Sequence, residues 1–342
     1  MSMQLKSKRD IWAKRARTWV FAAVCGAWAA GAHCAVRVDL FQATVPLVER
    51  TEAGQTAAFQ AAMRGVLVRV TGRRGGDQDP GLAPLVTDAR RYVQQFRGAP
   101  DNQLWVAFDA AAIERWLSQN GQPLWGRDRP STFVWLAISS GAGTGYVATR
   151  DDQSELKNSL DALAAERGIP LIWPGTADLQ ANHVDYGAIN NLSATTLADI
   201  ARHLGADAVL IGRAGAPLAA ANVRWVHVFQ DRSSEFSGAG AGVERAADAY
   251  AALFATSGAP APVDIEVTGM ADVRSYAGVQ SYLESLTFVT HVAVRAMSGD
   301  TVQFRLTTRG GADALQRALA LGGRLEAAEG GDGGVPRFRL RR

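Results

Sequence analysis

The sequence has very little cysteine. Of its 342 residues only Cys25 and Cys34 are cysteines, and both lie within the first 35 positions. The rest of the chain can therefore form no disulfide of its own and no thiolate metal cluster. Lysine is nearly as scarce, because Lys157 is the only lysine after residue 34, against 29 arginines. We attribute this bias to a GC-rich bacterial genome rather than to function.

Recognisable catalytic patterns are missing too. The sequence has no G-x-S-x-G nucleophile motif. Four histidines follow residue 34, namely His183, His203, His227 and His291. None forms an H-x-x-x-H pair, so a zinc site would need distant carboxylates, and only His183 with Asp185, in an expected loop, suggests catalysis. We therefore predict no catalytic, metal-binding or cofactor-binding residue, which favours a protein that is not an enzyme.

Two glycine-rich stretches invite comparison with phosphate-binding loops. Residues 139–145 follow an apolar strand, but their G-x-G-x-G spacing differs from the G-x-G-x-x-G of dinucleotide-binding loops. Residues 238–242 lie between an expected strand and an expected helix, where backbone amides can hold an anion. Their spacing is also wrong, and no Lys-Ser/Thr pair follows. We predict a hairpin loop for the first stretch and a flexible connector for the second.

The most informative feature that is present is the N-terminus. A basic segment with six positive residues and one acidic residue is followed by an apolar run at 19–30 and by small residues up to Ala35. This order is typical of a secretory signal peptide, and the run is shorter than the roughly 20 residues of a membrane-spanning helix. We predict that residues 1–34 are a cleaved signal and that the protein works in the periplasm. The alternatives are a retained inner-membrane anchor and a lipoprotein acylated at Cys34.

Cleavage would also change the charge of the protein. The formal net charge of the whole chain is +3, and removal of residues 1–34 lowers it to −2. The remaining chain has no basic footprint for nucleic acid and no polybasic segment for a membrane surface. We therefore expect no nucleic-acid partner, and a membrane contact only through an uncleaved leader.

After the leader, the pattern predicts a multi-domain protein of α/β and α+β class. Residues 36–130 are expected to form an N-terminal α+β domain, and residues 131–258 a small layered α/β domain with an antiparallel edge. In the first of these, the expected elements are a strand at 36–42, helices at 54–70 and 82–96, a strand at 104–108 and a helix at 110–119 that begins after Asp109.

A linker rich in proline and alanine at 257–262 precedes the third segment, residues 263–342. Its strand-helix-strand-strand-helix-strand order predicts a ferredoxin-like βαββαβ domain of four antiparallel strands with two helices on one face. The first helix is expected to bury Val273, Tyr276, Ala277, Val279, Leu283 and Leu286, and the second Ala314, Leu315, Ala318 and Leu319. Val292, Val294, Val302, Phe304 and Leu306 should point towards these helices.

The opposite, open face of this sheet is the predicted partner surface. It would carry the polar side chains His291, Arg295, Gln303 and Arg305. Two residues of the charged connector before residue 130 are added. Trp125 is predicted as a surface contact or as a wedge between domains, because tryptophan is enriched at interfaces, and Arg127 is included in the possible partner surface.

Five stretches carry a family resemblance: VRVTGR at 68–73, RYVQQF at 91–96, LWGRDRP at 124–130, GADAVLIGR at 205–213 and ALALGGRL at 318–325. Together, and in this order, they resemble a family of exported Gram-negative proteins known as domain of unknown function 2066. The stretch at 204–212 also resembles periplasmic α/β domains of the Tol system's propeller protein, the curli secretion lipoprotein and flagellar periplasmic proteins. The first resemblance implies an exported protein of unknown role, and the second implies binding of other proteins.

The expected function is therefore that of a periplasmic, non-enzymatic module that binds an envelope protein or takes part in envelope assembly. No cofactor is expected, and the partner is not identified by the sequence. The alternative is a periplasmic hydrolase whose site lies between domains. A pocket in which a histidine meets a carboxylate would favour that alternative.

Overall fold

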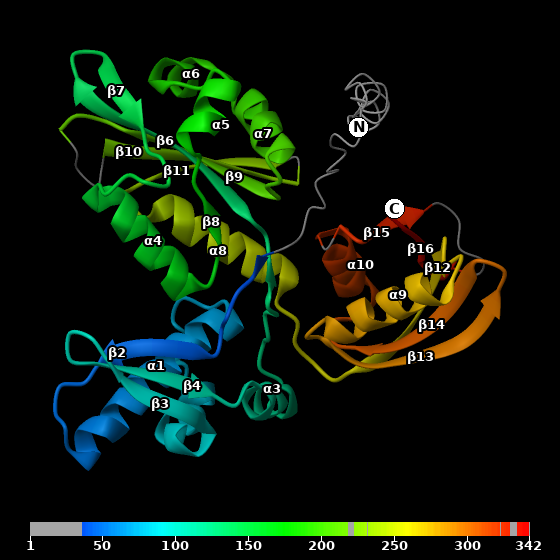
Figure 1. Cartoon of the computed structure of the whole chain (residues 1–342). Coiled ribbons are helices and arrows are strands. Elements are labelled where there is room, and N and C mark those ends of the chain that lie inside the picture. The colour runs from blue at the N-terminus through cyan, green and yellow to red at the C-terminus, as the bar shows by residue number, and fades with distance from the viewer. Residues whose placement is uncertain (1–35, 218–221, 231, 322, 329–333, 342) are drawn as a thin grey trace, which may run out of the picture. The chain divides into compact units, whose positions relative to one another are not determined.

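The computed structural model describes residues 36–217, 222–230, 232–321, 323–328 and 334–341. This part of the chain is a mixed α/β protein with three separate sheets (Figure 1). One additional pair of short strands is also present. Residues 1–34, which carry the signal-peptide prediction, lie outside the described residues. Within the described part, no helix has the length and apolar character needed to cross a membrane.

The first sheet and its helices comprise β2 (Gln42–Pro46), α1 (Glu52–Thr71), η1 (Gly76–Gln78), η2 (Pro80–Leu82), α2 (Ala83–Thr87), η3 (Ala89–Tyr92), β3 (Val93–Ala99), β4 (Gln103–Phe108) and α3 (Ala110–Gln119). The strands are antiparallel in the order β2-β4-β3. Phe59 of α1 is buried in one cluster with Val106 of β4.

The Thr51 hydroxyl accepts a hydrogen bond from the Gly54 amide at the start of α1. Gly72 ends this helix with a φ of 70°, which suits glycine.

One predicted helix of this segment is wrong. Residues 82–96 are expected to be helical throughout, but helical structure ends at Tyr92 and Val93 begins strand β3. This strand pairs with β4 across a turn in which Asp101 and Asn102 have positive φ. Strand pairing of this kind depends on the neighbouring strand rather than on local helix propensity.

Three other elements predicted for this segment are confirmed. The helix expected at 54–70 is α1, the strand at 104–108 is β4, and the helix at 110–119 is α3. Asp109 caps α3, because its carboxylate accepts a hydrogen bond from the amide of Ala112. The first strand is shorter than expected: β1 (Val36–Arg37) pairs with β5 (Asp128–Arg129), which lies in the connector.

The second sheet and its helices comprise β6 (Thr132–Gly141), β7 (Thr144–Val147), α4 (Glu155–Arg167), β8 (Leu171–Ile172), α5 (Thr176–Ala181), α6 (Tyr186–Asn191), α7 (Ala194–His203), β9 (Ala208–Ala214), β10 (Val223–Phe229), β11 (Arg232–Ser237) and α8 (Ala241–Phe254). The order is β11-β10-β9-β6-β7, with β8 beside the start of β6. Strand β6 runs parallel to β8 and β9, whereas the outer strands are antiparallel. Helices α4 and α8 bury the face of the sheet that includes Val134 and Leu210. Helices α5 to α7 bury the face that includes Trp135 and Ile211, so this segment is a layered α/β structure with an antiparallel edge.

Both glycine-rich stretches have structural roles. The first forms the predicted hairpin, in which β6 and β7 pair antiparallel. In the second, Gly242 lies in α8 against the indole of Trp225, and a Cβ there would come within 2.6 Å of that ring. Gly212 of β9 approaches the same indole, where a Cβ would lie 2.5 Å away. The stretch predicted as a flexible connector therefore also makes room for a buried tryptophan.

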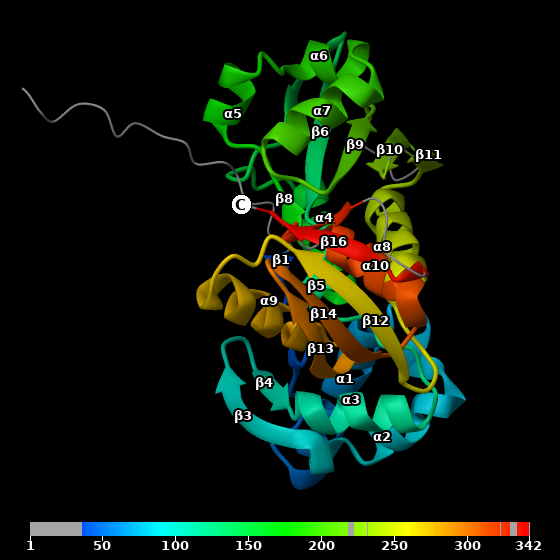
Figure 2. The same ribbon diagram turned by 90° about the vertical axis from the view of Figure 1, so that its right-hand side faces the viewer.

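The third sheet and its helices comprise β12 (Ala261–Thr268), α9 (Val273–Ser285), β13 (Val289–Ser298), β14 (Thr301–Thr308), α10 (Gly311–Leu321), β15 (Leu325–Ala328) and β16 (Arg337–Leu340). The strand order is β13-β14-β12-β16-β15. Figure 2 labels four of these strands, namely β13, β14, β12 and β16. The prediction of four antiparallel strands is wrong, because there are five strands and β16 runs parallel to β12. After α10 the chain forms a hairpin, and the second strand of this hairpin pairs with β12. Phe338 on β16 is buried, and the burial of its side chain favours a place for this strand inside the sheet rather than at its edge.

Side-chain burial in the third sheet follows the predicted alternation along β14. Val302, Phe304 and Leu306 are all buried in one cluster with residues of α9 and α10. The stripe of α9 is narrower than predicted: Val279 and Leu283 are buried, but Val273 is 83% exposed at the start of the helix. Ala277 is exposed as well. In the second helix Ala314, Leu315 and Leu319 are buried and Ala318 is half-buried.

The first two sheets each take their strands from one predicted segment, and the third sheet uses the third segment together with Ala261 and Pro262 of the predicted linker. The first uses residues 42–108, the second residues 132–237 and the third residues 261–340. This arrangement is consistent with several domains. The domain boundaries at residues 130, 258 and 263 stay predictions.

Candidate functional site

The six residues predicted as a partner surface do not form one surface. Trp125 is fully buried, so its prediction as a surface contact is wrong. It belongs to the core of the second sheet, and the guanidinium of Arg129 lies 3.4 Å from the centroid of its ring. Its backbone amide donates a hydrogen bond to the carbonyl of Val70 at the end of α1, at 2.7 Å. The alternative role of Trp125 as a wedge between domains stays a prediction.

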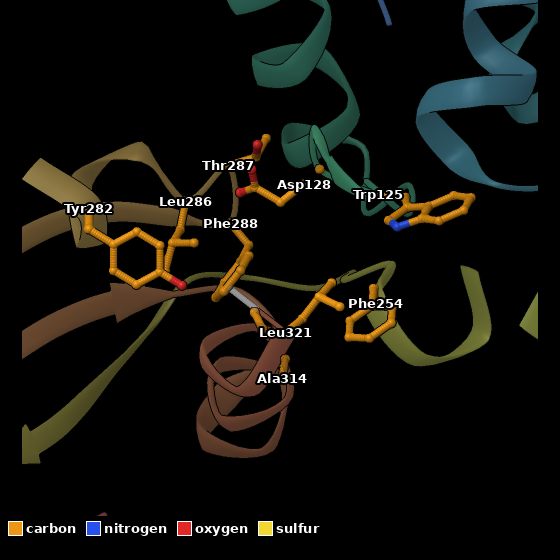
Figure 3. A pocket seen from close by; sticks show the side chains of 11 residues that line it. Trp125, Asp128, Phe254, Tyr282, Leu286, Thr287, Phe288, Ala314 and Leu321 are labelled. Carbon is orange, nitrogen blue, oxygen red and sulfur yellow. The ribbon is translucent and has the colours of Figure 1, made fainter. Parts of the chain in front are cut away.

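A small cavity adjoins Trp125 and has mostly apolar walls (Figure 3). Its volume is about 30 Å³, which is space for a water molecule or two. Phe254, Leu286, Phe288 and Leu321 are among the side chains around it. We interpret it as a gap in the packing between elements, because a substrate would not fit.

Arg127 also belongs to the connector and not to the open sheet face. Its side chain is half-buried, and its guanidinium lies 5.3 Å from the centroid of the Phe41 ring. Its backbone amide donates to the hydroxyl of Thr287 at 3.5 Å. Arg127 therefore ties the connector to its surroundings, and its place on a shared partner surface stays a prediction.

The remaining predicted residues lie exposed on strands β13 and β14 of the third sheet: His291, Arg295, Gln303 and Arg305. Side chains alternate between the two faces of a strand, and the even-numbered residues of β14 are buried under the helices. Gln303 and Arg305 therefore point to the open face. Arg305 stands directly opposite Asp264 of β12, and Gln303 opposite Glu266.

Asp264 is the electrostatic centre of this face. Its carboxylate accepts two hydrogen bonds from Arg305, each of 2.7 Å, and one from Arg295 of 3.2 Å. The hydrogen bond from Arg305 is the main cause that lowers the pKa of the Asp264 carboxyl, and the same bond raises the pKa of Arg305. Two guanidinium groups share one carboxylate, and β13 and β14 contain no acidic residue. The face is thus positively charged beside the outer edge of the sheet.

Strand β13 is that outer edge. It is ten residues long and pairs with β14 on one side only. An edge strand presents unpaired amide and carbonyl groups that can pair with an extended segment of another chain. Val294 and Met297 on this strand are 40% and 64% exposed. A shift in the pairing between Val294 and Ala296 forms a bulge, which limits the length of edge that a partner strand can follow.

The exposed edge is a candidate binding feature that was not predicted from the sequence. Val294 was expected to point towards the helices, and its strand was not identified as the edge of the sheet. Val294 stands opposite Phe304 and thus on the helix side, but it is 40% exposed because no strand follows β13. The βαββαβ order was the available signal, because its second strand lies at one edge of the sheet.

A polar network lies buried in the second sheet. His227 Nε2 is 3.0 Å from the hydroxyl of Tyr250, and that hydroxyl is 2.9 Å from Oγ1 of Thr132. Burial lowers the pKa of His227 to about 4 and raises the pKa of Tyr250. The imidazole is therefore neutral and is only 4% exposed. We interpret the network as part of the packing, because a substrate has no access to it.

This network predicts a pH dependence of stability. The pKa of His227 is lowered in the folded protein, from the ordinary 6.5 to about 4, so protonation favours the unfolded chain. Above pH 6.5 the neutral imidazole of His227 makes its full contribution to the free energy of unfolding. This contribution declines as the pH falls towards 4. We expect urea unfolding to show this decline in the wild-type protein and a flatter profile in His227→Gln. The exposed His203 is the control, and identical profiles for wild type and His227→Gln would contradict the prediction.

The other histidine candidate does not form a catalytic pair. His183 is exposed, and Asp185 instead caps α6 by accepting a hydrogen bond from the amide of Ala188 at 2.7 Å. Among the described residues, no group of three or more histidine, cysteine, aspartate or glutamate side chains is placed to hold a metal. Two larger open cavities, of about 440 and 470 Å³, have no histidine in their walls. The hydrolase alternative therefore gains no support from these cavities.

Comparison with known proteins gives a partial assignment. Residues 35–126 match a domain of unknown function, DUF8605. This match covers the first sheet with α1, α2 and α3, and ends at the connector. The name differs from domain of unknown function 2066, which the sequence resemblance suggested. Neither the curated proteins nor the solved structures show a significant match to the chain. The chain thus contains the domain of unknown function DUF8605 at residues 35–126.

Proposed function

We propose that this protein is an exported component of the cell envelope that binds an extended, acidic segment of another envelope protein along β13. The observation that carries this proposal is the long edge strand beside a positively charged sheet face. Main-chain hydrogen bonds would provide affinity, as they do wherever a peptide adds a strand to a sheet.

The charges next to the edge favour an acidic partner. Arg295, Arg305 and His291 are exposed, and Asp264 is the only carboxylate that pairs with these arginines in the described residues. Complementary charge would speed association and select among partners more than it would raise affinity. Met297, exposed on the same strand, offers an apolar contact to the incoming segment.

Export to the periplasm belongs to this proposal and rests on the basic and apolar pattern of residues 1–34. A non-enzymatic role is favoured because the candidate Asp185 caps α6 and the candidate His183 is exposed. The hydrolase with a site between domains is the second candidate, but no observation in the structure favours it.

We also propose a family and a fold for the parts that the DUF8605 match does not cover. The resemblance to domain of unknown function 2066 extends over the whole chain after the leader. For the third segment we propose a variant of the ferredoxin-like fold, in which the β15–β16 hairpin takes the place of the last strand. The order β13-β14-β12 and the common cluster with α9 and α10 support this proposal.

Photocrosslinking in cells tests the partner proposal. A photoreactive residue at Met297 of β13 should form an adduct with a specific protein in the periplasmic fraction of Gram-negative cells. Val294→Lys should abolish the adduct, because a charged residue in the middle of an edge strand opposes pairing. Mass spectrometry of the adduct identifies the partner segment, which should be rich in aspartate and glutamate.

The matched control is Val273→Lys. Val273 is an exposed valine of the same segment, at 83%, but lies at the start of α9 and not on the edge. This variant should keep the adduct. Failure to obtain any adduct at Met297 at several expression levels, or an adduct that Val294→Lys leaves unchanged, would rule out strand addition at β13.

A further inference from the structure

A separate feature lies at the end of the second sheet. An open cavity of about 470 Å³ lies at the carboxyl ends of the parallel strands β6 and β9. Its polar lining residues are Ser139, Tyr186, Asn190, Arg213, Asn222 and Arg224. In open α/β sheets, ligands bind outside the carboxyl ends of the strands. The position of this cavity is therefore one where a binding site is expected on general grounds.

Two arginines dominate its charge. Arg213 of β9 and Arg224 of β10 stand directly opposite each other in the antiparallel pair of strands. Like charges in this position destabilise a sheet. None of the described lining residues is acidic, and among the described residues no carboxylate forms an ion pair with either guanidinium. The two positive charges therefore remain uncompensated at the wall of an open cavity.

Neighbouring groups hold these arginines and complete the wall. Arg213 donates two hydrogen bonds, of 3.1 and 2.7 Å, from Nε and Nη2 to the carbonyl of Ile189 in α6. This contact leaves its Nη1 group for other acceptors. Tyr186 of α6 packs on Gly145, where a Cβ would come within 2.3 Å of the tyrosine ring. The glycine-rich hairpin thus allows Tyr186 to lie close to β7 at this end of the sheet.

We propose that this cavity binds a small ligand through an anionic group, phosphate or carboxylate, held between Arg213 and Arg224. A planar guanidinium group can donate two hydrogen bonds to the oxygens of a phosphate or a carboxylate. Hydrogen bonds to charged acceptors are also stronger than hydrogen bonds to neutral ones. The Ser139 hydroxyl accepts a hydrogen bond from the amide of Gly141, so its own hydrogen is free to donate to the anion. The binding of an anion would also offset the repulsion between the two arginines.

Titration calorimetry with inorganic phosphate and with acetate tests this proposal on the purified protein. Wild type should bind at least one of the two anions saturably, and Arg224→Gln should weaken that binding by about tenfold or more. Arg224 is exposed, so the variant is expected to fold. Without added anion its melting temperature should equal or exceed that of the wild type, because the like-charge pair is gone.

Arg232→Gln is the matched control. Arg232 is an exposed arginine of the adjacent strand β11 and does not line the cavity. This variant should bind the anion as the wild type does. Binding of phosphate alone would identify a phosphorylated ligand, and binding of acetate alone a carboxylate. If neither anion binds saturably, or if Arg224→Gln binds as tightly as the wild type, the proposal is wrong.

Discussion

Replacement of Phe304 by alanine is expected to lower the free energy of unfolding by about 3–5 kcal/mol, the usual cost of truncating a buried phenylalanine. Phe304 has an exposed fraction of 0%. Its ring stacks on Tyr276 of α9 with centroids 6.2 Å apart, and it stands opposite Ile265 of the neighbouring strand. Loss of the ring would leave a cavity between the sheet and its helices. Urea denaturation followed by circular dichroism measures the change.

The adjacent Gln303 supplies the control. Gln303→Ala changes an exposed side chain on the other face of the same strand, where substitutions usually change stability by less than about 0.5 kcal/mol. Equal losses of unfolding free energy in Phe304→Ala and Gln303→Ala would mean that the side-chain alternation along β14 is wrong. A loss in Gln303→Ala alone would mean that the strand turns its other face to the helices.

Arg167→Met is expected to cost about 1.5–3 kcal/mol, because it removes the hydrogen bonds of a buried guanidinium to two charged acceptors. Arg167 is 1% exposed and lies at the end of α4. It donates hydrogen bonds to Glu244, to Asp248 at 2.7 Å and to the carbonyl of Gly72 at 3.1 Å. The substitution would leave two carboxylates and a carbonyl without their buried donor. Denaturant unfolding again gives the magnitude.

Arg74 provides a close comparison, since it pairs with the same two carboxylates at 3.0 and 3.1 Å. Its side chain is 56% exposed, and exposed ion pairs contribute about 1 kcal/mol or less. Arg74→Met should therefore cost much less than Arg167→Met. Similar losses of unfolding free energy in Arg74→Met and Arg167→Met would contradict this expectation. They would show that burial does not decide how much each arginine contributes to stability.

Sequence reasoning succeeded where structure follows from neighbouring residues. The cap of α3 at Asp109 could be recognised because capping depends on a polar side chain just before a helix. The inward positions of Val302, Phe304 and Leu306 followed from the two-residue period of a strand. The hairpin at 139–145 followed from glycines in a spacing that no phosphate loop uses.

The same reasoning failed where distant segments meet. The helix predicted to 96 ended at Tyr92, because strand β4 offered Val93 and its successors a pairing partner. Trp125 was predicted as a surface contact or a wedge between domains because tryptophan is enriched at interfaces, but it is buried in the core of the second sheet and bonded to the end of α1. A side chain's burial depends on which elements pack over it, and that information is not local.

By itself, the sequence determined the predicted export signal, the class of mixed α/β structure and the polar character of one face of the third sheet. These properties depend on composition and on short periods along the chain. Only the tertiary structure decided that β16 pairs parallel with β12 and that Arg213 faces Arg224. Strand order and cross-strand neighbours are set by long-range packing, because the free energy of burying one face of a sheet belongs to the assembled layers and not to any single segment.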